Sequence, residues 1–483
     1  MKTLNFIAGA WQPAGHGRVF DVRNPADESL IAQVPDSGAK DAQRAADAAH
    51  TALATWKAKT AGERATVLKK WHALIVEHTE VIAAQISREQ GKPLAEGRGE
   101  VAYSAGYVEW FAEEAVRAYG EIIAAPAANR KLLVVKEPVG VVAVVTPWNF
   151  PAAMITRKIA PALAAGCTVV AKPAEDTPLT SLLLVALAQE AGVPPGVLNI
   201  VTASREHAAE VVGAWLTDPR VRKISFTGST PVGKLLARES AATLKKLSLE
   251  LGGNAPFIVF EDADIAAAVE GLMAAKFRNG GQTCVSPNRV YVQEAVHDRF
   301  VDKLVTRVGA LRVGPATWPQ AEIGPMINAR AVDKIERHVN DAVTKGAKVV
   351  CGGRRVKSEV ANGPNYYAPT VLVNAAREMQ LSCEETFGPV VPVFRFKDEQ
   401  EVLCLANDTP YGLAGYFYSN DVRRIWRVAS ALETGMVGIN EGAIAAQAAP
   451  FGGVKESGYG REGSHWGLDE YMHTKYLCQG NLA

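Results

Sequence analysis

Short apolar runs alternate with helical stretches between residues 139 and 253, and this alternation limits the possible folds more than any other feature of the sequence. Each run has the length of a strand and is apolar enough to be covered on both faces. Such alternation predicts an α/β fold, with a parallel sheet between two layers of helices. The predicted strands span residues 139–145, 167–171, 197–201 and 221–226, with 247–251 as a fifth candidate.

Helix start and stop signals agree with this arrangement. Thr177 can cap a helix that has Pro178 at its first position, and Gly192 lies where that helix should end. Residues 41–89 and 100–117 have helical periodicity with charged faces. We expect these stretches to pack on the sheet.

A second alternating stretch begins after Gly253 and predicts a second α/β unit. Asp264 can cap its first helix, and Gly280 and Gly281 can end that helix. Two further segments, Lys131–Lys136 and Lys475–Gln479, fit neither unit and are predicted to be protruding strands that pair between subunits. The predicted elements of the second unit are strand 256–260, helix 265–277, strand 290–292 and helices 298–310 and 329–345.

Composition excludes several classes of partner. The 483 residues carry 52 basic and 51 acidic side chains, so the net charge of +1 gives no reason to expect a nucleic acid or a membrane surface. No apolar run is long enough for a secretory signal or a membrane span, and we expect a soluble, cytoplasmic protein with a small-molecule partner. The six cysteines lie far apart without a Cys-x-x-Cys pair, so neither a disulfide framework nor a metal site is expected.

Cys284 and Glu250 are candidates for chemistry. Cys284 follows Gly280 and Gly281 just past a predicted helix end, which favours access and a nucleophilic role; a small buried hydrophobic side chain is the alternative. Glu250 lies in an apolar, strand-like run, where burial would raise its pKa and suit a general base. A water-facing glutamate on an edge strand is the alternative for Glu250.

Three segments follow predicted strands at the edge where open α/β sheets bind ligands. Asn149 is held between two prolines there, so that its amide could stabilise an oxyanion, although it could also be a plain turn residue. Glu175 suits a ribose diol and would repel a 2′-phosphate, which favours NAD over NADP. The glycine-containing turn 226–233 enters a helix that could hold a pyrophosphate, but G-x-G-x-x-G is absent.

Together these segments resemble the aldehyde dehydrogenase superfamily over nearly the whole chain. The family's motifs occur in its order and with its approximate spacing. The matching segments are 146–151, 172–175, 226–233, 249–254, 281–284, 384–389 and 450–455.

The resemblance implies a cysteine thioester mechanism. Cys284 would be the nucleophile, Glu250 the general base, and Asn149 with the Cys284 backbone N–H the oxyanion hole. Hydride would pass to NAD, with NADP also possible, and Glu250 would then activate water to release the acid. The implied cofactor-binding residues are Pro147, Trp148, Lys172, Glu175, Gly228, Ser229, Gly233, Leu251, Glu385 and Phe387.

The resemblance also implies a division into domains and an oligomer. We expect a Rossmann-like NAD(P)-binding domain over 1–120 and 139–252, and a catalytic domain over 253–449. Segments 121–138 and 465–483 would form a small oligomerisation β-extension. A homodimer or homotetramer is expected.

Within the family the resemblance is strongest to the succinate-semialdehyde and glutarate-semialdehyde enzymes. In those enzymes two arginines, matching Arg157 and Arg278, clamp the carboxylate at the far end of the substrate. A structural ion pair is the alternative for either arginine.

Two positions depart from that group. Ser286 replaces a cysteine two residues after Cys284, so a redox-switch disulfide is not possible there. Ala445 stands where relatives carry a serine that helps to hold the substrate carboxylate. Succinate semialdehyde is the first expectation, but this loss leaves open a longer substrate such as glutarate or 2-oxoglutarate semialdehyde.

Other classes of protein fit the residues less well. A coenzyme-A-acylating relative would generally lack the base, and Glu250 is present. A non-catalytic binding relative would not need Cys284, Glu250 and Asn149 together. A thiol hydrolase would leave the nucleotide motifs unexplained.

Overall fold

The computed structural model describes residues 2–482, and its first sheet is the parallel sheet predicted between residues 139 and 253. Eight strands lie in the order β2-β1-β9-β8-β7-β10-β11-β21. The five central strands, from β9 to β11, are parallel; β1 and β21 flank them in the antiparallel direction, and β2 pairs antiparallel with β1. The strands are β1 (Asn5–Ile7), β2 (Ala10–Gln12), β7 (Val141–Val145), β8 (Thr168–Lys172), β9 (Leu198–Ile200), β10 (Val221–Thr227), β11 (Lys246–Glu250) and β21 (Gly458–Tyr459).

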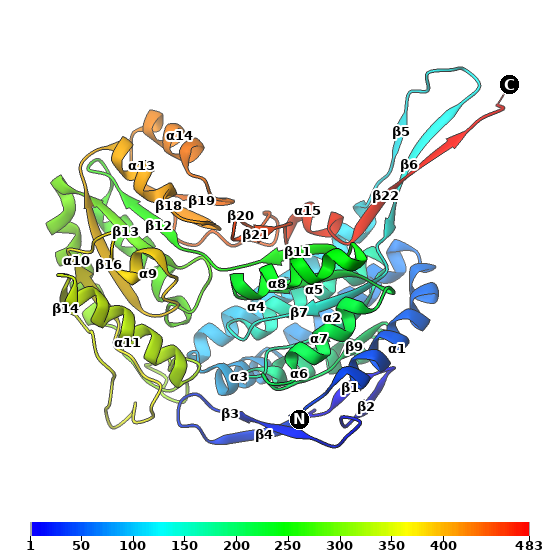
Figure 1. Ribbon diagram of the computed structural model, residues 1–483, viewed down its shortest axis with the longest axis horizontal. Helices are drawn as coiled ribbons and strands as arrows, with labels where there is room; N and C mark the ends of the chain where they lie inside the picture. The colour runs from blue at the N-terminus through cyan, green and yellow to red at the C-terminus, as the bar shows by residue number, and fades with distance from the viewer. Residues whose placement is uncertain (1, 483) are drawn as a thin grey trace.

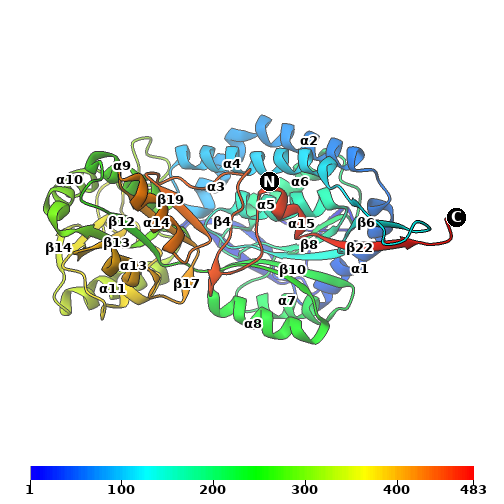
Figure 2. The ribbon, with the colours of Figure 1, turned by 90° about the horizontal axis from the view of Figure 1, so that it is seen from above.

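Helices cover both faces of this sheet, as Figure 2 shows from above. One layer contains α2, α4 and α5, and the other contains α7 and α8. The two faces enclose separate apolar clusters, because each strand contributes alternate side chains to each layer. The helices are α1 (Ala39–Lys57), α2 (Ala61–Glu77), α3 (Thr79–Gln90), α4 (Leu94–Glu114), α5 (Pro151–Ala165), α6 (Pro178–Glu190), α7 (Ala208–Thr217) and α8 (Thr230–Ser240).

The second sheet lies beside the first in Figure 1 and has the order β14-β15-β16-β13-β12-β18-β19. Helices α9 and α10 pack on one face, and α11, α13 and α14 on the other. The strands are β12 (Ala255–Val259), β13 (Pro287–Gln293), β14 (Lys348–Cys351), β15 (Thr370–Val373), β16 (Val390–Phe396), β18 (Ala414–Tyr418) and β19 (Met436–Ile439). The helices are α9 (Ile265–Phe277), α10 (His297–Gly309), α11 (Ala329–Thr344), α12 (Gln380–Cys383), α13 (Glu399–Asn407) and α14 (Val422–Ala431).

A three-stranded arm projects from the molecule next to the C-terminus (Figure 1). It contains β5 (Glu121–Ile123), β6 (Lys131–Pro138) and β22 (Met472–Gln479). The two segments predicted to protrude pair with each other within the chain, with Val134 opposite Tyr476. The arm leaves apolar side chains in solvent, and Ile122 is 84% exposed.

Short strands complete the chain. A hairpin of β3 (Val19–Arg23) and β4 (Leu30–Pro35) lies near the N-terminus, and β17 (Tyr411–Gly412) pairs with β20 (Val454–Lys455). Strand β21 then adds to the first sheet, and α15 (Ser464–Asp469) leads into the arm. The C-terminal segment therefore returns from the second sheet to the first.

The helix signals were confirmed in one case and wrong in another. Helix α9 spans Ile265–Phe277 as predicted, and the Asp264 carboxylate accepts hydrogen bonds from the first-turn amides of Ala266 and Ala267. Thr177 precedes α6, but its side chain does not cap the helix. The buried Glu89 carboxylate of α3 caps it, accepting from Leu179 N at 2.8 Å and Thr180 N at 2.7 Å.

Residues 2–482 lack two kinds of structural feature. No helix there has both the length and the apolar character needed to cross a membrane. The same residues contain no group of histidine, cysteine, aspartate and glutamate side chains suited to a metal ion.

Candidate active site

Cys284 lies just beyond the end of α9, on a loop with an unusual backbone. Asn279, Gly280 and Gly281 have φ of 54°, 61° and 77°, so the chain makes a left-handed turn directly after the helix. A Cβ atom on Gly281 would collide with the carbonyl oxygen of Gly388, which requires glycine at that point. The turn brings the partly exposed Cys284 to the wall of a pocket.

This pocket has a volume of about 410 Å³ and lies at the carboxyl edge of the first sheet. One wall comes from the loops after β7, β8, β10 and β11, and the other from α11 and the loop after α12. The structure therefore brings to one place residues that are far apart in sequence. The predicted residues on its wall are Pro147, Trp148, Asn149, Glu175, Gly228, Ser229, Leu251, Cys284, Glu385 and Phe387.

Two predicted cofactor residues lie behind the wall. Lys172 is buried at the end of β8, where its Nζ donates to Pro173 O at 3.0 Å and lies 3.8 Å from the Glu175 carboxylate. Gly233 is in the first turns of α8, and a Cβ there would collide with the Leu251 side chain. Gly233 thus allows close packing of helix on strand rather than contact with the pocket.

The pocket has the chemistry of a dinucleotide site. Ser229 precedes α8 without capping it through its side chain, and the buried Thr227 Oγ1 has no hydrogen-bond partner within residues 2–482. A phosphate would satisfy such groups at a helix N-terminus. A second cavity of about 420 Å³ shares Glu175 and Arg205 with the pocket, which suits an extended ligand.

Trp148 and Phe387 line the same pocket as Cys284. Their ring centroids lie 5.5 Å apart, edge to face. Next to them, the Glu385 carboxylate accepts from Gly253 N at 3.1 Å. Burial raises the pKa of Glu385 to about 7. A carboxyl that is about half protonated at neutral pH and two aromatic rings suit a flat, partly charged ring such as nicotinamide.

Glu250 is a buried carboxylate at the end of β11. Only 2% of the residue is exposed, and neither carboxyl oxygen has a hydrogen-bond partner among the described residues. Burial and the charge of Glu462 raise its pKa well above the usual value, while Arg157 and Lys158 act in the opposite direction. The water-facing alternative is wrong. Glu250 is not among the residues that line the pocket of Cys284, but its burial and raised pKa suit a general base.

The surroundings of Cys284 favour the protonated thiol. Burial raises its pKa to about 12, with smaller contributions from Glu385 and Glu250 opposed by Arg157. The thiolate is the nucleophile in cysteine chemistry. A reaction at Cys284 therefore needs a neighbouring base or a change in the local charge.

Asn149 is fixed from two sides. Its Nδ2 donates to Gln282 O at 3.1 Å, and its carbonyl oxygen accepts from Lys92 Nζ and from Asn279 Nδ2, each at 2.9 Å. The amide nitrogen has two N–H groups, so one remains available. Asn149 is thus tied to the loop that carries Cys284.

The two predicted clamp arginines differ in their surroundings. Arg157 is buried and forms an ion pair with Glu462, which also pairs with Lys158. Its guanidinium lies 4.6 Å from the Phe451 ring centroid. The structure thus favours the ion-pair alternative for Arg157, whose charge is already matched within the protein.

Arg278 is partly exposed and lies on an aromatic surface. Its guanidinium carbon is 4.7 Å from the Phe150 ring centroid and 5.7 Å from that of Tyr103. The ion pairs formed by residues 2–482 do not include Arg278. Ala445 lies in the loop after β19, where Gln447 Nε2 donates to Tyr103 O at 3.3 Å.

The sequence reasoning missed Glu462 and Lys92. Glu462 lies between Arg157 and Lys158 and raises the pKa of Glu250, yet it is more than 200 residues from Glu250 in the chain. Lys92 is buried below Asn149. The only local signal is a neighbouring turn residue, since Lys92 lies between Gly91 and Pro93 and Glu462 precedes Gly463, and such charged residues are common in turns.

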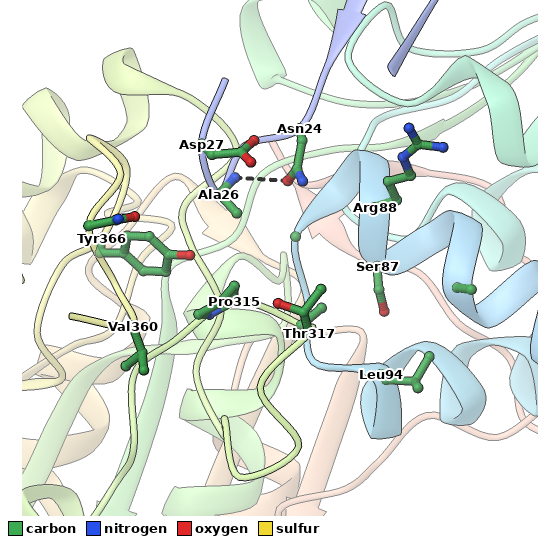
Figure 3. A pocket seen from close by; sticks show the side chains of 14 residues that line it. Asn24, Ala26, Asp27, Ser87, Arg88, Leu94, Pro315, Thr317, Val360 and Tyr366 are labelled. Carbon is green, nitrogen blue, oxygen red and sulfur yellow. Dashed lines mark hydrogen bonds between the residues drawn. The ribbon is translucent and has the colours of Figure 1, made fainter. Parts of the chain in front are cut away.

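A larger cavity of about 490 Å³ lies elsewhere, between the N-terminal segment, α3 and loops of the second unit (Figure 3). Asp27 and Arg88 are on its walls, and Asn24 Oδ1 accepts from Ala26 N within it. It contains none of the predicted catalytic or cofactor residues. The smaller pocket beside Cys284 is therefore the candidate active site.

Comparison with known proteins gives full-length matches. A family model described as the aldehyde dehydrogenase family matches residues 11–477. The chain is 53% identical to 3-sulfolactaldehyde dehydrogenase of Pseudomonas putida, covering 100% of this chain and 98% of that protein. It is also 53% identical to succinate-semialdehyde dehydrogenase [NADP(+)] of Escherichia coli K12, and this match covers 98% of this chain and 97% of that protein.

A solved structure matches equally well. The crystal structure of succinate-semialdehyde dehydrogenase from Burkholderia pseudomallei has a TM-score of 0.97 and 52% identity, and the match covers 99% of this chain and 98% of that one. These matches confirm the predicted α/β fold. The chain therefore belongs to the aldehyde dehydrogenase family and is an NAD(P)-dependent oxidoreductase.

Proposed function

We propose that this enzyme oxidises an aldehyde with an anionic group at its far end, succinate semialdehyde first, to the corresponding acid through a thioester on Cys284. One juxtaposition carries the proposal: Cys284 lies on the wall of a pocket of about 410 Å³, and Arg278, six residues earlier, has no carboxylate partner among the ion pairs of residues 2–482. A cation in this place can hold the substrate anion at a fixed distance from the sulfur.

The residues around Cys284 divide the chemistry. The Cys284 thiol gives its proton to water in the pocket, and Cys284 Sγ bonds to the carbonyl carbon. The Asn149 amide and the Cys284 backbone N–H stabilise the negative oxygen. The bound dinucleotide supplies the acceptor for the hydride that leaves this carbon. Glu250 then takes a proton from water, whose oxygen displaces the sulfur and yields the acid.

The anionic group at the far end of the substrate can be a carboxylate or a sulfonate. The relatives named for succinate semialdehyde and for 3-sulfolactaldehyde act, by those names, on aldehydes with a terminal carboxylate and a terminal sulfonate. Arg278 can bind either group through charge-assisted hydrogen bonds. Ala445 offers no hydroxyl to a carboxylate, which leaves glutarate or 2-oxoglutarate semialdehyde as the alternative substrate.

The cofactor choice follows from the ribose end of the pocket. Glu175 lines it together with Asp176, whose pKa is raised to about 6 by burial and by the Glu175 charge. Two carboxyls close together disfavour a 2′-phosphate. We therefore propose NAD as the preferred cofactor, with NADP accepted less well, although a relative is named for NADP(+).

Assembly and location complete the proposal. The unpaired edges of β5 and β22 and the exposed Ile122 favour pairing of the arm with other subunits, in a homodimer or homotetramer. The NAD(P)-binding domain would comprise 1–120 and 139–252, the catalytic domain 253–449, and the oligomerisation segments 121–138 and 465–483. A cytoplasmic location would supply the dinucleotide.

A panel of aldehydes tests the function. Steady-state kinetics with each cofactor would compare aldehydes of equal length that end in a carboxylate, a sulfonate or an uncharged amide. We expect kcat/KM to be greater for the anionic members by about 10- to 100-fold, the worth of one charge-assisted pair. Equal values for charged and uncharged members would contradict the proposed substrate class.

A further inference from the structure

Lys92 lies directly beneath the candidate oxyanion hole. It follows α3 in the segment Gly91-Lys92-Pro93, and its side chain is completely buried. The ammonium donates to Asn149 O at 2.9 Å and to Glu100 Oε2 at 2.6 Å. It also lies 3.9 Å from the centroid of the Phe150 ring. A buried lysine with its three directions occupied has one fixed position.

Glu100 connects this lysine to the next helix. Its second carboxyl oxygen accepts from Ala152 N at 2.8 Å, in the first turn of α5. A negative charge there is favourable because the helix N-terminus presents unpaired N–H groups. Lys92 and Glu100 thus hold the turn before α5 at its carbonyl and the helix at its first amide.

The same turn is tied to the nucleophile loop. Asn279 Nδ2 donates both to Asn149 O at 2.9 Å and to Gln282 O at 3.2 Å. Asn149 Nδ2 donates to Gln282 O at 3.1 Å. Since Gln282 is two residues before Cys284, the Asn149 amide and the sulfur belong to one hydrogen-bonded unit, and Lys92 holds one end of it.

We propose that Lys92 is a positioning residue for the oxyanion hole. It fixes the Asn149 main chain, so that the free N–H of the Asn149 amide points at the place where the substrate oxygen becomes negative. This inference rests on the oxyanion role proposed for Asn149. Loss of the Lys92 contact would let the amide move, and small misplacements of catalytic groups are costly.

The test removes the charge without leaving a partner unpaired. Lys92→Met alone leaves Glu100 charged in the interior, which costs stability. The double variant Lys92→Met/Glu100→Gln retains the volumes and removes both charges. Lys245→Met is the matched control, because Lys245 Nζ also donates to two carbonyls, Asp218 O and Val221 O, but at the opposite edge of the sheet.

Four measurements distinguish positioning from a structural role. The first two are the burst of cofactor reduction with an aldehyde and the hydrolysis of 4-nitrophenyl acetate without cofactor, which both require a stabilised oxyanion on Cys284. The others are cofactor affinity by calorimetry and alkylation of Cys284 by iodoacetamide, which do not. We expect both oxyanion-dependent rates to fall by a common factor of about 10 to 100 in the double variant.

The remaining two values should stay unchanged in the double variant, and all four should stay unchanged in Lys245→Met. Ester hydrolysis at the wild-type rate in the double variant would overturn the proposal. So would a parallel loss of cofactor affinity, or an equal loss in Lys245→Met. The ester does not depend on which aldehyde is the substrate, so failure of the aldehyde panel would not be mistaken for failure of this inference.

Discussion

Arg157 and Arg278 were predicted to share one role, yet their surroundings differ. Arg157 is 1% exposed and pairs with the Glu462 carboxylate. Arg278 is partly exposed on the Phe150 and Tyr103 rings, and its guanidinium takes part in none of the ion pairs among residues 2–482. Aromatic rings attract a cation without neutralising it, whereas a carboxylate does both. The comparison shows that an arginine can stabilise the fold or can remain free to bind a substrate anion, depending on its partner in the protein.

The largest expected effect tests whether Arg157 stabilises the fold through its ion pair with Glu462. Arg157→Met would leave Glu462 with only Lys158 as its partner, and we expect a loss of about 3–5 kcal/mol in the free energy of unfolding. Urea denaturation would measure it. Arg157→Met/Glu462→Gln should recover part of that loss, because it removes the uncompensated charge. A fully stable Arg157→Met with only a raised KM would place Arg157 in the substrate site instead.

The next largest effect tests whether Arg278 binds the anionic group of the substrate. Arg278→Met should raise KM for an anionic aldehyde by about 10- to 100-fold, since it removes a charge-assisted contact. The KM of an uncharged aldehyde should not change, and the stability should change by less than about 1 kcal/mol. Kinetics on both aldehydes and urea denaturation give these values. Equal losses on the two aldehydes would remove the distinction between the arginines.

The pH dependence of kcat distinguishes the two arginines by their effect on the pKa of Glu250. Arg157 lowers the pKa of Glu250, so Arg157→Met should raise that pKa further. Since a general base works in its deprotonated form, the acid limb of the profile should then move to higher pH. Arg278→Met should leave the limb in place. Profiles between about pH 5 and 9 would show this, and a shift with Arg278→Met would contradict it.

The smallest expected effect concerns the loop beside the aromatic surface. Ala445→Ser restores the hydroxyl that the resemblance led us to expect. A single added hydrogen bond contributes about 0.5–1.5 kcal/mol, so kcat/KM for succinate semialdehyde should rise about 2- to 10-fold. Glutarate semialdehyde, assayed in parallel, should gain less because its carboxylate reaches a different point. An equal gain for both would show that Ala445 does not set chain length.

Local sequence signals predicted the parts of the fold that local physics decides. The apolar runs at β7, β8, β10 and β12 gave strands because each is buried on both faces, whatever else the chain does. Helix α9 agreed at both ends, since its cap is the adjacent Asp264. The α6 cap could not be predicted in this way. Glu89, which provides it, is about ninety residues away and is brought there only by packing.

The site divides in the same manner. Cys284 and Asn149 each lie in a short sequence motif that can be recognised, and the fold brings both residues to one pocket. Glu462 and Lys92 act through residues distant in the chain, so no spacing rule could indicate them. The Arg157 prediction failed to choose between two roles because the partner that decides it, Glu462, belongs to the C-terminal segment that returns to the first sheet.

The central claim is that a covalent acyl group forms on Cys284, and Glu250→Gln allows it to be observed directly. In this variant the thioester should form but hydrolyse slowly, because the base that activates water is lost. After mixing with an anionic aldehyde and NAD⁺ and quenching with acid, mass spectrometry should find the acyl group on the peptide that contains Cys284, with a stoichiometric burst of NADH. An acyl group on another cysteine, or a burst of NADH that persists in Cys284→Ala, would contradict the account.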